Sequence, residues 1–282
     1  MNTAPEQPDQ AAPANQYLEA DRVLAELGEH GTRRVTGLTA PQILVLGALA
    51  GGFITMGALF SLLMGSAVEA EGPKRLLEGF GFATGFFFVI LSSAILFTEA
   101  NVTMPSTVLA ARSPGRQIAR FWILAVLGNL IGAVVISGLI VLAQDYGPNV
   151  EGLLDEIIEA KLSWREEGGV GSWLRVVLSG MLANWLVGMA AFFAIMARTI
   201  IGKYIPILLA VTLFVSANLQ HSPANMGYFS LAEWMGMGPG VDVAFAWNII
   251  PAGIGNLIGG TVFVVLPLWY GLRLRERLGT AD

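Results

Sequence analysis

The sequence lacks cysteine altogether and is poor in charged residues. Its 282 residues include no Cys, and only 13% are Asp, Glu, Lys or Arg. The absence of cysteine excludes disulfides, thiolate metal ligands and cysteine nucleophiles. A soluble domain of ordinary composition carries about a quarter charged residues, so the low charge argues against a soluble protein. Histidine is rare as well: the chain contains His30 and His221 and no other.

Long apolar runs fill the stretches without charge. Hydrophobic residues make up 54% of the chain, and a helix needs about 20 consecutive apolar residues to cross a bilayer. The runs therefore predict an all-α membrane protein with six transmembrane helices. We expect these spans at about residues 41–67, 79–98, 121–143, 173–196, 205–219 and 243–270.

The basic residues between the spans predict the orientation of the chain. With the N-terminus inside, the cytoplasmic segments hold most of the Lys and Arg residues, and the positive-inside rule then places both termini in the cytoplasm. We expect a cytoplasmic tail at 1–40 with a short amphipathic helix, a membrane domain at 41–272 and a cytoplasmic tail at 273–282. No signal peptide is expected, because the first 40 residues are polar.

A five-residue motif occurs in both halves of the chain. The sequence GNLIG occupies residues 128–132 in the third predicted span and 255–259 in the sixth. Three spans per half is an odd number, so the second half must enter the membrane inverted. Inverted repeats are a recurrent architecture of transporters. A second interpretation, compatible with the first, is that both motifs are small-residue packing faces.

The middle span of each half is interrupted by polar residues and a proline. The interruptions are expected at residues 98–105 in the second span and 218–225 in the fifth. Backbone that leaves a helix inside a membrane is tolerated only where it is buried in protein or lines a cavity. Paired interruptions at corresponding places therefore predict the path of a transported molecule.

His221 is the residue of the spans that most favours a functional interpretation. An ionisable side chain within a span is costly, which makes function the default hypothesis. The alternative is a neutral histidine that hydrogen-bonds two helices. Thr98 lies at the other interruption and its hydroxyl can donate or accept, so we expect it to share a ligand with His221. Glu99 is expected to be solvated near the cytoplasmic end.

These segments resemble the formate/nitrite transporter family. The resemblance runs from about residue 40 to 272 and identifies a divergent member. The matching segments are Gly202-Lys203 followed by HSPANM at 221–226, LFTEAN at 96–101, NWLV at 184–187, and NIIP at 248–251 with GNLIGG at 255–260.

The resemblance implies an aquaporin-like fold, a homopentamer in the bacterial cytoplasmic membrane and one pore in each protomer. It implies small monovalent anions or their weak acids, such as formate or nitrite, as substrates. We expect no enzyme activity, cofactor, metal or nucleic acid. The family pattern implies a polar pore site of His221, Thr98 and Asn248, and apolar constrictions formed by Phe82, Phe86, Leu96, Phe97 and Phe214.

The expected mechanism follows from the cost of burying charge. A bare anion cannot pass apolar constrictions cheaply, whereas a neutral weak acid can. His221 and Thr98 are therefore expected to hydrogen-bond the anion or help to protonate it, so that it crosses as the acid.

Two positions depart from the family pattern. Gln220 precedes the histidine where the family usually has Glu, and the place of a lysine at the outer mouth falls near Gly168, with Lys161 and Arg165 close by. These departures keep a non-conducting structural or regulatory subunit as an alternative. A neutral-solute channel is the other alternative, although the two Asn-Pro-Ala motifs of an aquaporin are absent.

Overall fold

The computed structural model describes residues 17–110 and 115–277, with side chains described as far as residue 272. Within these ranges the chain is helical and contains no strand, which confirms the predicted all-α class. The longer helices are α1 (Ala20–Gly37), α2 (Ala40–Gly65), α3 (Glu71–Ser92), α4 (Phe97–Leu109), α5 (Gly115–Ala143), α6 (Pro148–Leu162), α7 (Gly169–Met196), α8 (Ile200–Ser216), α9 (Ser222–Trp234), α11 (Ile250–Ile258) and α12 (Leu266–Arg277). Shorter segments are η1 (Ser163–Arg165), α10 (Val241–Ala244) and the π-helical turns η2 (Phe245–Ile249) and η3 (Gly259–Val265).

Five described helices are long and apolar enough to cross a membrane. They are α2, α3, α5, α7 and the continuous helix Val241–Leu272, which runs from α10 into α12. α8 is apolar but has only 17 residues, and the chain continues after a break as α9. The count of six spans therefore stays a prediction.

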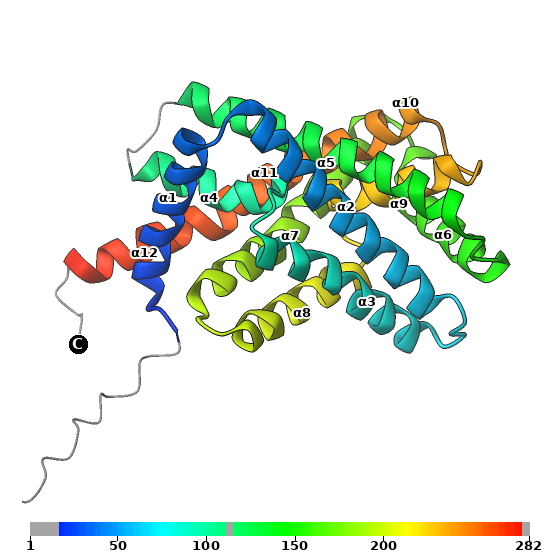
Figure 1. Cartoon of the computed structure of the whole chain (residues 1–282), viewed down its shortest axis with the longest axis horizontal. Helices are drawn as coiled ribbons and strands as arrows, with labels where there is room; N and C mark the ends of the chain where they lie inside the picture. Colours follow the sequence, from blue (N-terminus) through cyan, green and yellow to red (C-terminus); the bar gives the residue numbers. More distant parts are fainter. Residues whose placement is uncertain (1–16, 111–114, 278–282) are drawn as a thin grey trace, which may run out of the picture.

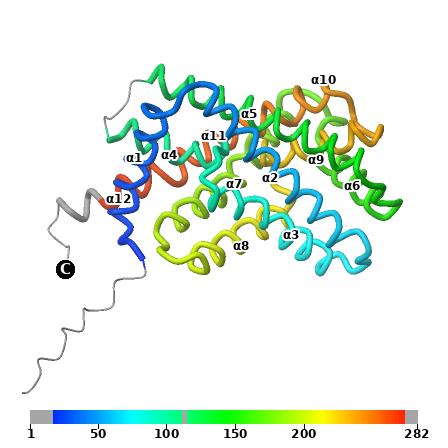
Figure 2. Tube along the Cα trace, viewed as in Figure 1, coloured from blue at the N-terminus to red at the C-terminus, as the bar shows by residue number. Residues whose placement is uncertain are grey.

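Different helices lie at the two ends of the molecule. α1 and α12 lie at one end of the long axis, and α6 and α10 lie at the other (Figures 1 and 2). α3 and α8, the first parts of the two interrupted spans, pack side by side (Figure 1). This arrangement brings the breaks that follow them into the interior.

The two GNLIG motifs pack the long helices in the same way. A Cβ at Gly132 of α5 would lie 1.9 Å from the Ala48 carbonyl oxygen of α2. A Cβ at Gly259, just after α11, would lie 2.2 Å from the Met181 carbonyl oxygen of α7. Small residues thus let two pairs of backbones touch, as predicted for a membrane packing face.

The break in the second span lies earlier than predicted. α3 ends at Ser92 and α4 begins at Phe97, so residues 98–105 are helical rather than irregular. Ser93 adopts the left-handed conformation (φ 57°), and the Ala94 N–H donates to the Val89 carbonyl at 3.2 Å. This is a Schellman ending. Backbone geometry, and not the polarity of the following side chains, therefore decides where α3 stops.

The break in the fifth span overlaps its predicted place, and α8 ends in the same way as α3. The break covers residues 217–221, so the last four of the predicted residues, 222–225, are helical in α9. Asn218 is left-handed (φ 49°), and the Leu219 N–H donates to the Phe214 carbonyl at 3.0 Å. Together with the common packing of the glycine motifs, these matching endings support the predicted repeat.

The terminal regions differ in detail from the expected boundaries. α1 lies where a short amphipathic helix is expected and buries Val23 and Leu27. α12 continues to Arg277, past the boundary expected at residue 272. Residues 1–16 and 278–282 of the expected tails lie outside the described residues.

The close backbone contacts predict a large effect of one added methyl group. Gly132→Ala should destabilise the protein by about 1–3 kcal/mol, because the new Cβ overlaps a carbonyl oxygen that cannot move alone. Gly152→Ala in α6 is the control: no atom lies within 4 Å of its Cβ position, and helix propensity favours Ala. Thermal unfolding of the purified protein in detergent would measure both. Equal melting temperatures for the two variants would contradict this packing.

Candidate functional site

The two breaks bring Thr98 and His221 into contact at the centre of the molecule. His221 Nε2 lies 2.8 Å from Thr98 Oγ1, and both residues are buried, His221 being 1% exposed. The residues come from different halves, 123 positions apart. The structure therefore brings together two of the three residues predicted for a polar site.

The hydrogen bonds of His221 define its tautomer. The residue caps α9, and its Nδ1 accepts a hydrogen bond from the Ala224 N–H at 3.3 Å. With Nδ1 an acceptor, a neutral ring carries its proton on Nε2, and Nε2–H donates to Thr98 Oγ1. The Thr98 hydroxyl proton is then left to donate to a further acceptor. The pair forms a relay that ends in a directed O–H donor.

Two asparagines hold the broken backbone on either side of this pair. Asn129 of the first GNLIG motif donates to the Gly47 and Ile95 carbonyls at 2.9 and 2.8 Å and accepts from the Phe97 N–H at 2.9 Å. A buried, unpaired peptide group would cost about 1–3 kcal/mol. The side chain thus satisfies the groups that the break removes from helical bonding.

Asn256 of the second motif repeats this pattern. It donates to the Gly180 and Gln220 carbonyls, both at 2.9 Å, and accepts from the Ser222 N–H at 2.8 Å. Each asparagine binds the carbonyl of one residue and the N–H of the residue two positions later. The residue between them is His221 here and Leu96 in the first half. The polar ring and the leucine therefore occupy equivalent places in the two halves.

The electrostatic setting of the pair favours negative charge. α4 begins at Phe97 and α9 begins at Ser222, so both helices start beside Thr98 and His221. A helix N-terminus carries roughly half a positive elementary charge and presents free N–H groups. Two such ends converge on one buried hydrogen bond.

The five residues predicted for apolar constrictions are all buried. The Phe214 ring lies 5.2 Å from the His221 ring and 5.8 Å edge-on from the Phe82 ring, measured between centroids. Phe82 and Phe214 thus form one apolar layer on the α6 side of His221. The other predicted members, Phe86, Leu96 and Phe97, are at most 8% exposed. Their role as constrictions stays a prediction.

Asn248 contacts the residue next to His221, and its predicted place in the polar site stays a prediction. Its Nδ2 donates to Gln220 Oε1 at 2.9 Å and to the Lys161 carbonyl at 3.0 Å, and no hydrogen bond joins it to Thr98 or His221. Asn225 Nδ2 donates to the same Gln220 oxygen at 2.9 Å. These three buried amides fix the residue before His221 to the end of α6.

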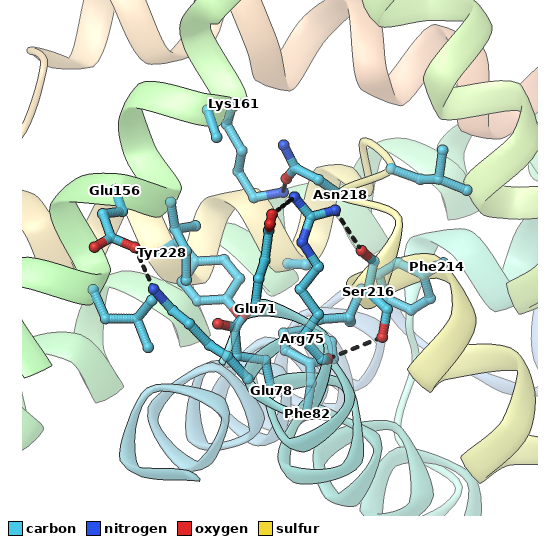
Figure 3. Close-up of a pocket in the computed structure, with 17 residues that line it drawn as sticks. Glu71, Arg75, Glu78, Phe82, Glu156, Lys161, Phe214, Ser216, Asn218 and Tyr228 are labelled. Carbon is cyan, nitrogen blue, oxygen red and sulfur yellow. Dashed lines mark hydrogen bonds and ion pairs between the residues drawn. The ribbon is translucent and has the colours of Figure 1, made fainter. Parts of the chain in front are cut away.

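A cavity of about 160 Å³ lies beyond Phe82 and Phe214, between α3, α6, α8 and α9; we name it the α6 cavity (Figure 3). Its charged and aromatic lining consists of Glu71, Lys74, Arg75, Glu78, Phe82, Glu156, Lys161, Phe214 and Tyr228.

Lys161 is a residue of the candidate site that the sequence analysis names only as close to the expected place of an outer-mouth lysine. Its side chain reaches into the α6 cavity (Figure 3) and the residue is only 6% exposed. The ammonium has a long hydrogen bond to Asn218 Oδ1 (3.4 Å) and lies 5.7 Å from the Tyr228 ring centroid, but forms no ion pair within the described part of the chain. Burial lowers its pKa to about 8, against a smaller opposing effect of Glu78. A buried cation without a salt bridge is a strong attractor for an anion.

A signal for Lys161 was present in the sequence. Val150, Leu154, Ile158 and Lys161 follow helical spacing, and all four are buried on one face of α6. A lysine at the end of an apolar helical stripe predicts a buried ammonium.

A second cavity of about 330 Å³ lies at the other end, under α1; we name it the α1 cavity. Here Glu99 is buried rather than solvated as expected, because it forms an ion pair with Arg34 of α1 at 2.8 Å. Arg34 also donates to the Ser93 carbonyl at 3.1 Å, so α1 is tied to the break after α3. His30 lines the same cavity, and burial together with Arg34 lowers its pKa.

Neither cavity reaches the Thr98–His221 pair in this structure. The lining of the α6 cavity includes Phe82 and Phe214 but not His221. The lining of the α1 cavity includes Ala94 and Glu99 but not Thr98. The polar pair therefore lies between two cavities and behind apolar side chains.

Comparisons with known proteins agree on one kind of protein. Residues 21–270 match the family model for the formate/nitrite transporter. A probable formate transporter of Methanothermobacter thermautotrophicus is 29% identical over 81% of this chain and 88% of its own length. A solved structure described as an FNT family ion channel matches 89% of this chain and 99% of its own, with a TM-score of 0.78 and 22% identity. A pentameric formate channel with formate bound matches 83% and 97%, with a TM-score of 0.67 and 25% identity.

The asparagine contacts predict that Asn256 is essential for the fold around His221. Asn256→Leu should destabilise the protein by about 2–5 kcal/mol, because two carbonyls and one N–H lose their partner in the interior. Asn149→Leu, at an exposed position near the start of α6, should change stability by less than about 0.5 kcal/mol. Chemical or thermal unfolding in detergent measures both; a near-neutral Asn256→Leu would show that the break has other partners.

Proposed function

Because the chain belongs to the formate/nitrite transporter family, we propose that it forms a transmembrane pore for small monovalent anions or their weak acids. The single observation that carries this proposal is the Thr98–His221 hydrogen bond, which lies buried between two cavities where two helices begin. Similar proteins are described as formate transporters and channels, so formate is the first substrate to test.

The first step of the proposed mechanism is capture of the anion in the α6 cavity. Lys161 supplies a positive charge there, and its backbone is held by Asn248. In a partly dry cavity two opposite charges attract several times more strongly than in water. By the positive-inside rule this cavity faces outward and the α1 cavity faces the cytoplasm.

The second step is passage through the apolar layer as a neutral molecule. Phe82 and Phe214 close the α6 cavity toward His221, and an isolated charge cannot leave water for such a layer without a large cost. The anion therefore takes up a proton and crosses as the weak acid. Phe82 and Phe214 must move apart for the molecule to pass.

The third step uses the relay of His221 and Thr98. The imidazole stays neutral, because a proton on Nδ1 would break its hydrogen bond with the Ala224 N–H. Its Nε2–H orients the Thr98 oxygen, so that the hydroxyl proton points to the passing molecule. The Thr98 hydroxyl and the two helix N-termini together stabilise the partially negative acceptor oxygen of the neutral acid beyond the layer of Phe82 and Phe214.

The assembly follows from the same similarity. The solved formate channel that matches this chain is described as pentameric, so we propose a homopentamer with a pore in each protomer, in the bacterial cytoplasmic membrane. A non-conducting subunit is the alternative that the flux experiment below excludes or supports.

The relay predicts that the Thr98 hydroxyl is needed for flux. Purified protein in liposomes should take up labelled formate faster than empty liposomes, and Thr98→Val should lower that rate at least about tenfold, the loss expected for one buried hydrogen bond of roughly 1.4 kcal/mol. Thr98→Ser keeps a hydroxyl and should retain most of the rate.

His221 provides the outcome that contradicts the mechanism. If His221→Ala left both the rate and its pH dependence unchanged, the relay would have no role. Uptake of urea or glycerol but not of formate would instead support a neutral-solute channel, and no uptake of either by wild type would support a non-conducting subunit.

The pKa of Lys161 predicts how capture depends on outer pH. The ammonium is present below about pH 8 and is lost as the pH rises above that value. Between pH 7 and pH 9 the external half-saturation concentration should therefore rise more for wild type than for Lys161→Arg, whose guanidinium stays charged. Lys161→Met should show the high-pH value at both. If the half-saturation concentration changed with pH in the same way for wild type and Lys161→Arg, Lys161 would have no role in capture.

A further inference from the structure

The α6 cavity contains a carboxyl group that the proposed function does not use. Glu78 of α3 is 8% exposed and lines the cavity, with no hydrogen bond or ion pair to any described residue. The backbone makes room for it: a Cβ on Gly65, the last residue of α2, would lie 2.6 Å from Glu78 Cγ. Burying an acid costs free energy, so a buried carboxyl group for which the neighbouring backbone leaves room points to a function.

The other acids of the cavity differ from Glu78 in both exposure and pairing. Glu71 forms an ion pair with Arg75, and Glu156 forms one with Lys74, and both carboxylates are largely exposed. Among the charged groups of this lining, only Glu78 and Lys161 are buried and lack an ion pair. Figure 3 shows Lys161 reaching into the cavity from α6 and Glu78 from α3, on the opposite side.

Glu78 and Lys161 lie close enough to act on each other electrostatically. An anion held by Lys161 is therefore also exposed to the field of Glu78. An ionised Glu78 repels that anion, whereas a protonated Glu78 does not. By linkage the effect is reciprocal: a bound anion must favour the protonated carboxyl by the same factor.

We propose that Glu78 couples entry of the anion into the α6 cavity to uptake of a proton from the outer solution. The inference rests on the proposed function and adds to it the residue that makes capture depend on pH. The cavity accepts a monovalent anion and a proton together, before either reaches Phe82 and Phe214.

The groups that face Glu78 set the conditions of a test. They are Glu71, Lys74 and Arg75 on α3 itself, Glu156 and Lys161 on α6, and Tyr228 on α9; the cavity-lining residues of α8 carry no charge. Lys161 stays mostly protonated below pH 7, since its pKa is about 8. A window from pH 5 to pH 7 therefore isolates the carboxyl groups from the lysine.

The test uses nitrate as the probe, because nitrate stays fully ionised over this window. Any pH dependence of its binding must therefore come from the protein. Its inhibition constant against formate uptake is measured in proteoliposomes at pH 5 and pH 7. For wild type we expect nitrate to bind roughly tenfold more tightly at pH 5, the effect of removing a like charge several ångströms away in a partly wet cavity. Glu78→Gln should bind tightly at both pH values.

Two further variants separate this role from a merely structural one. Glu78→Asp keeps a titrating carboxyl and should keep the pH dependence. Glu156→Gln removes an exposed, ion-paired acid from the same cavity and should leave the wild-type profile. The proposal is overturned if Glu78→Gln keeps the wild-type ratio between pH 5 and pH 7, or if nitrate does not inhibit wild type at either pH.

A direct binding measurement distinguishes failure of this inference from failure of the proposed function. Nitrate binding to the purified protein in detergent is followed by calorimetry at the same two pH values. Wild type without formate uptake would contradict the proposed pore. Nitrate binding whose pH dependence disappears in Glu78→Gln would still support the coupling, and binding with unchanged pH dependence in that variant would overturn it.

Discussion

The structure depends on one constraint: a bilayer offers no water to a peptide group that leaves a helix. The two interrupted spans expose carbonyl and N–H groups in the interior, and Asn129 and Asn256 each provide a partner for one carbonyl and one N–H of a break, in almost identical geometry. The same motifs bring their glycines against neighbouring backbones. One short sequence thus both packs the long helices and allows the others to break. Without the breaks, α4 and α9 would not begin beside each other, and Thr98 and His221 would not meet.

The common frame of the two halves carries different chemistry in each. Between its two asparagine-bound peptide groups the first half has Leu96, and the second half has His221. The residue before them is Ile95 in one half and Gln220 in the other, and only Gln220 extends the polar region, through Asn225 and Asn248, to α6. Because Gln220 is neutral, it accepts these amide hydrogen bonds without adding a negative charge near Lys161.

Much of this was predictable from the sequence, and the exceptions have physical reasons. Apolar runs, the two polar interruptions and the GNLIG motifs indicated the fold class and the meeting of Thr98 with His221. The break in the second span was predicted too late in the chain, because a Schellman ending at Ser93 requires no glycine or proline that the sequence would show. Glu99 and Lys161 were misjudged because their burial depends on partners distant in sequence: Arg34 on α1 for Glu99, and the walls of the α6 cavity for Lys161. Single-residue polarity contains no information on such contacts.

The unequal cavities have a consequence for import and export. On one face the buried Lys161 ammonium has no ion pair among the described residues, whereas on the other face Arg34 forms an ion pair with Glu99 and Lys203 donates to the Ala194 carbonyl. We therefore expect the two faces to bind an anion with different affinity. A passive pore yields no net flow between equal solutions, so the quotient of maximal velocity and half-saturation must be the same from either side. The face with the lower half-saturation concentration must consequently have the lower maximal velocity. In the proposed orientation, such a pore takes up the anion at low outer concentration and releases it fastest at high inner concentration.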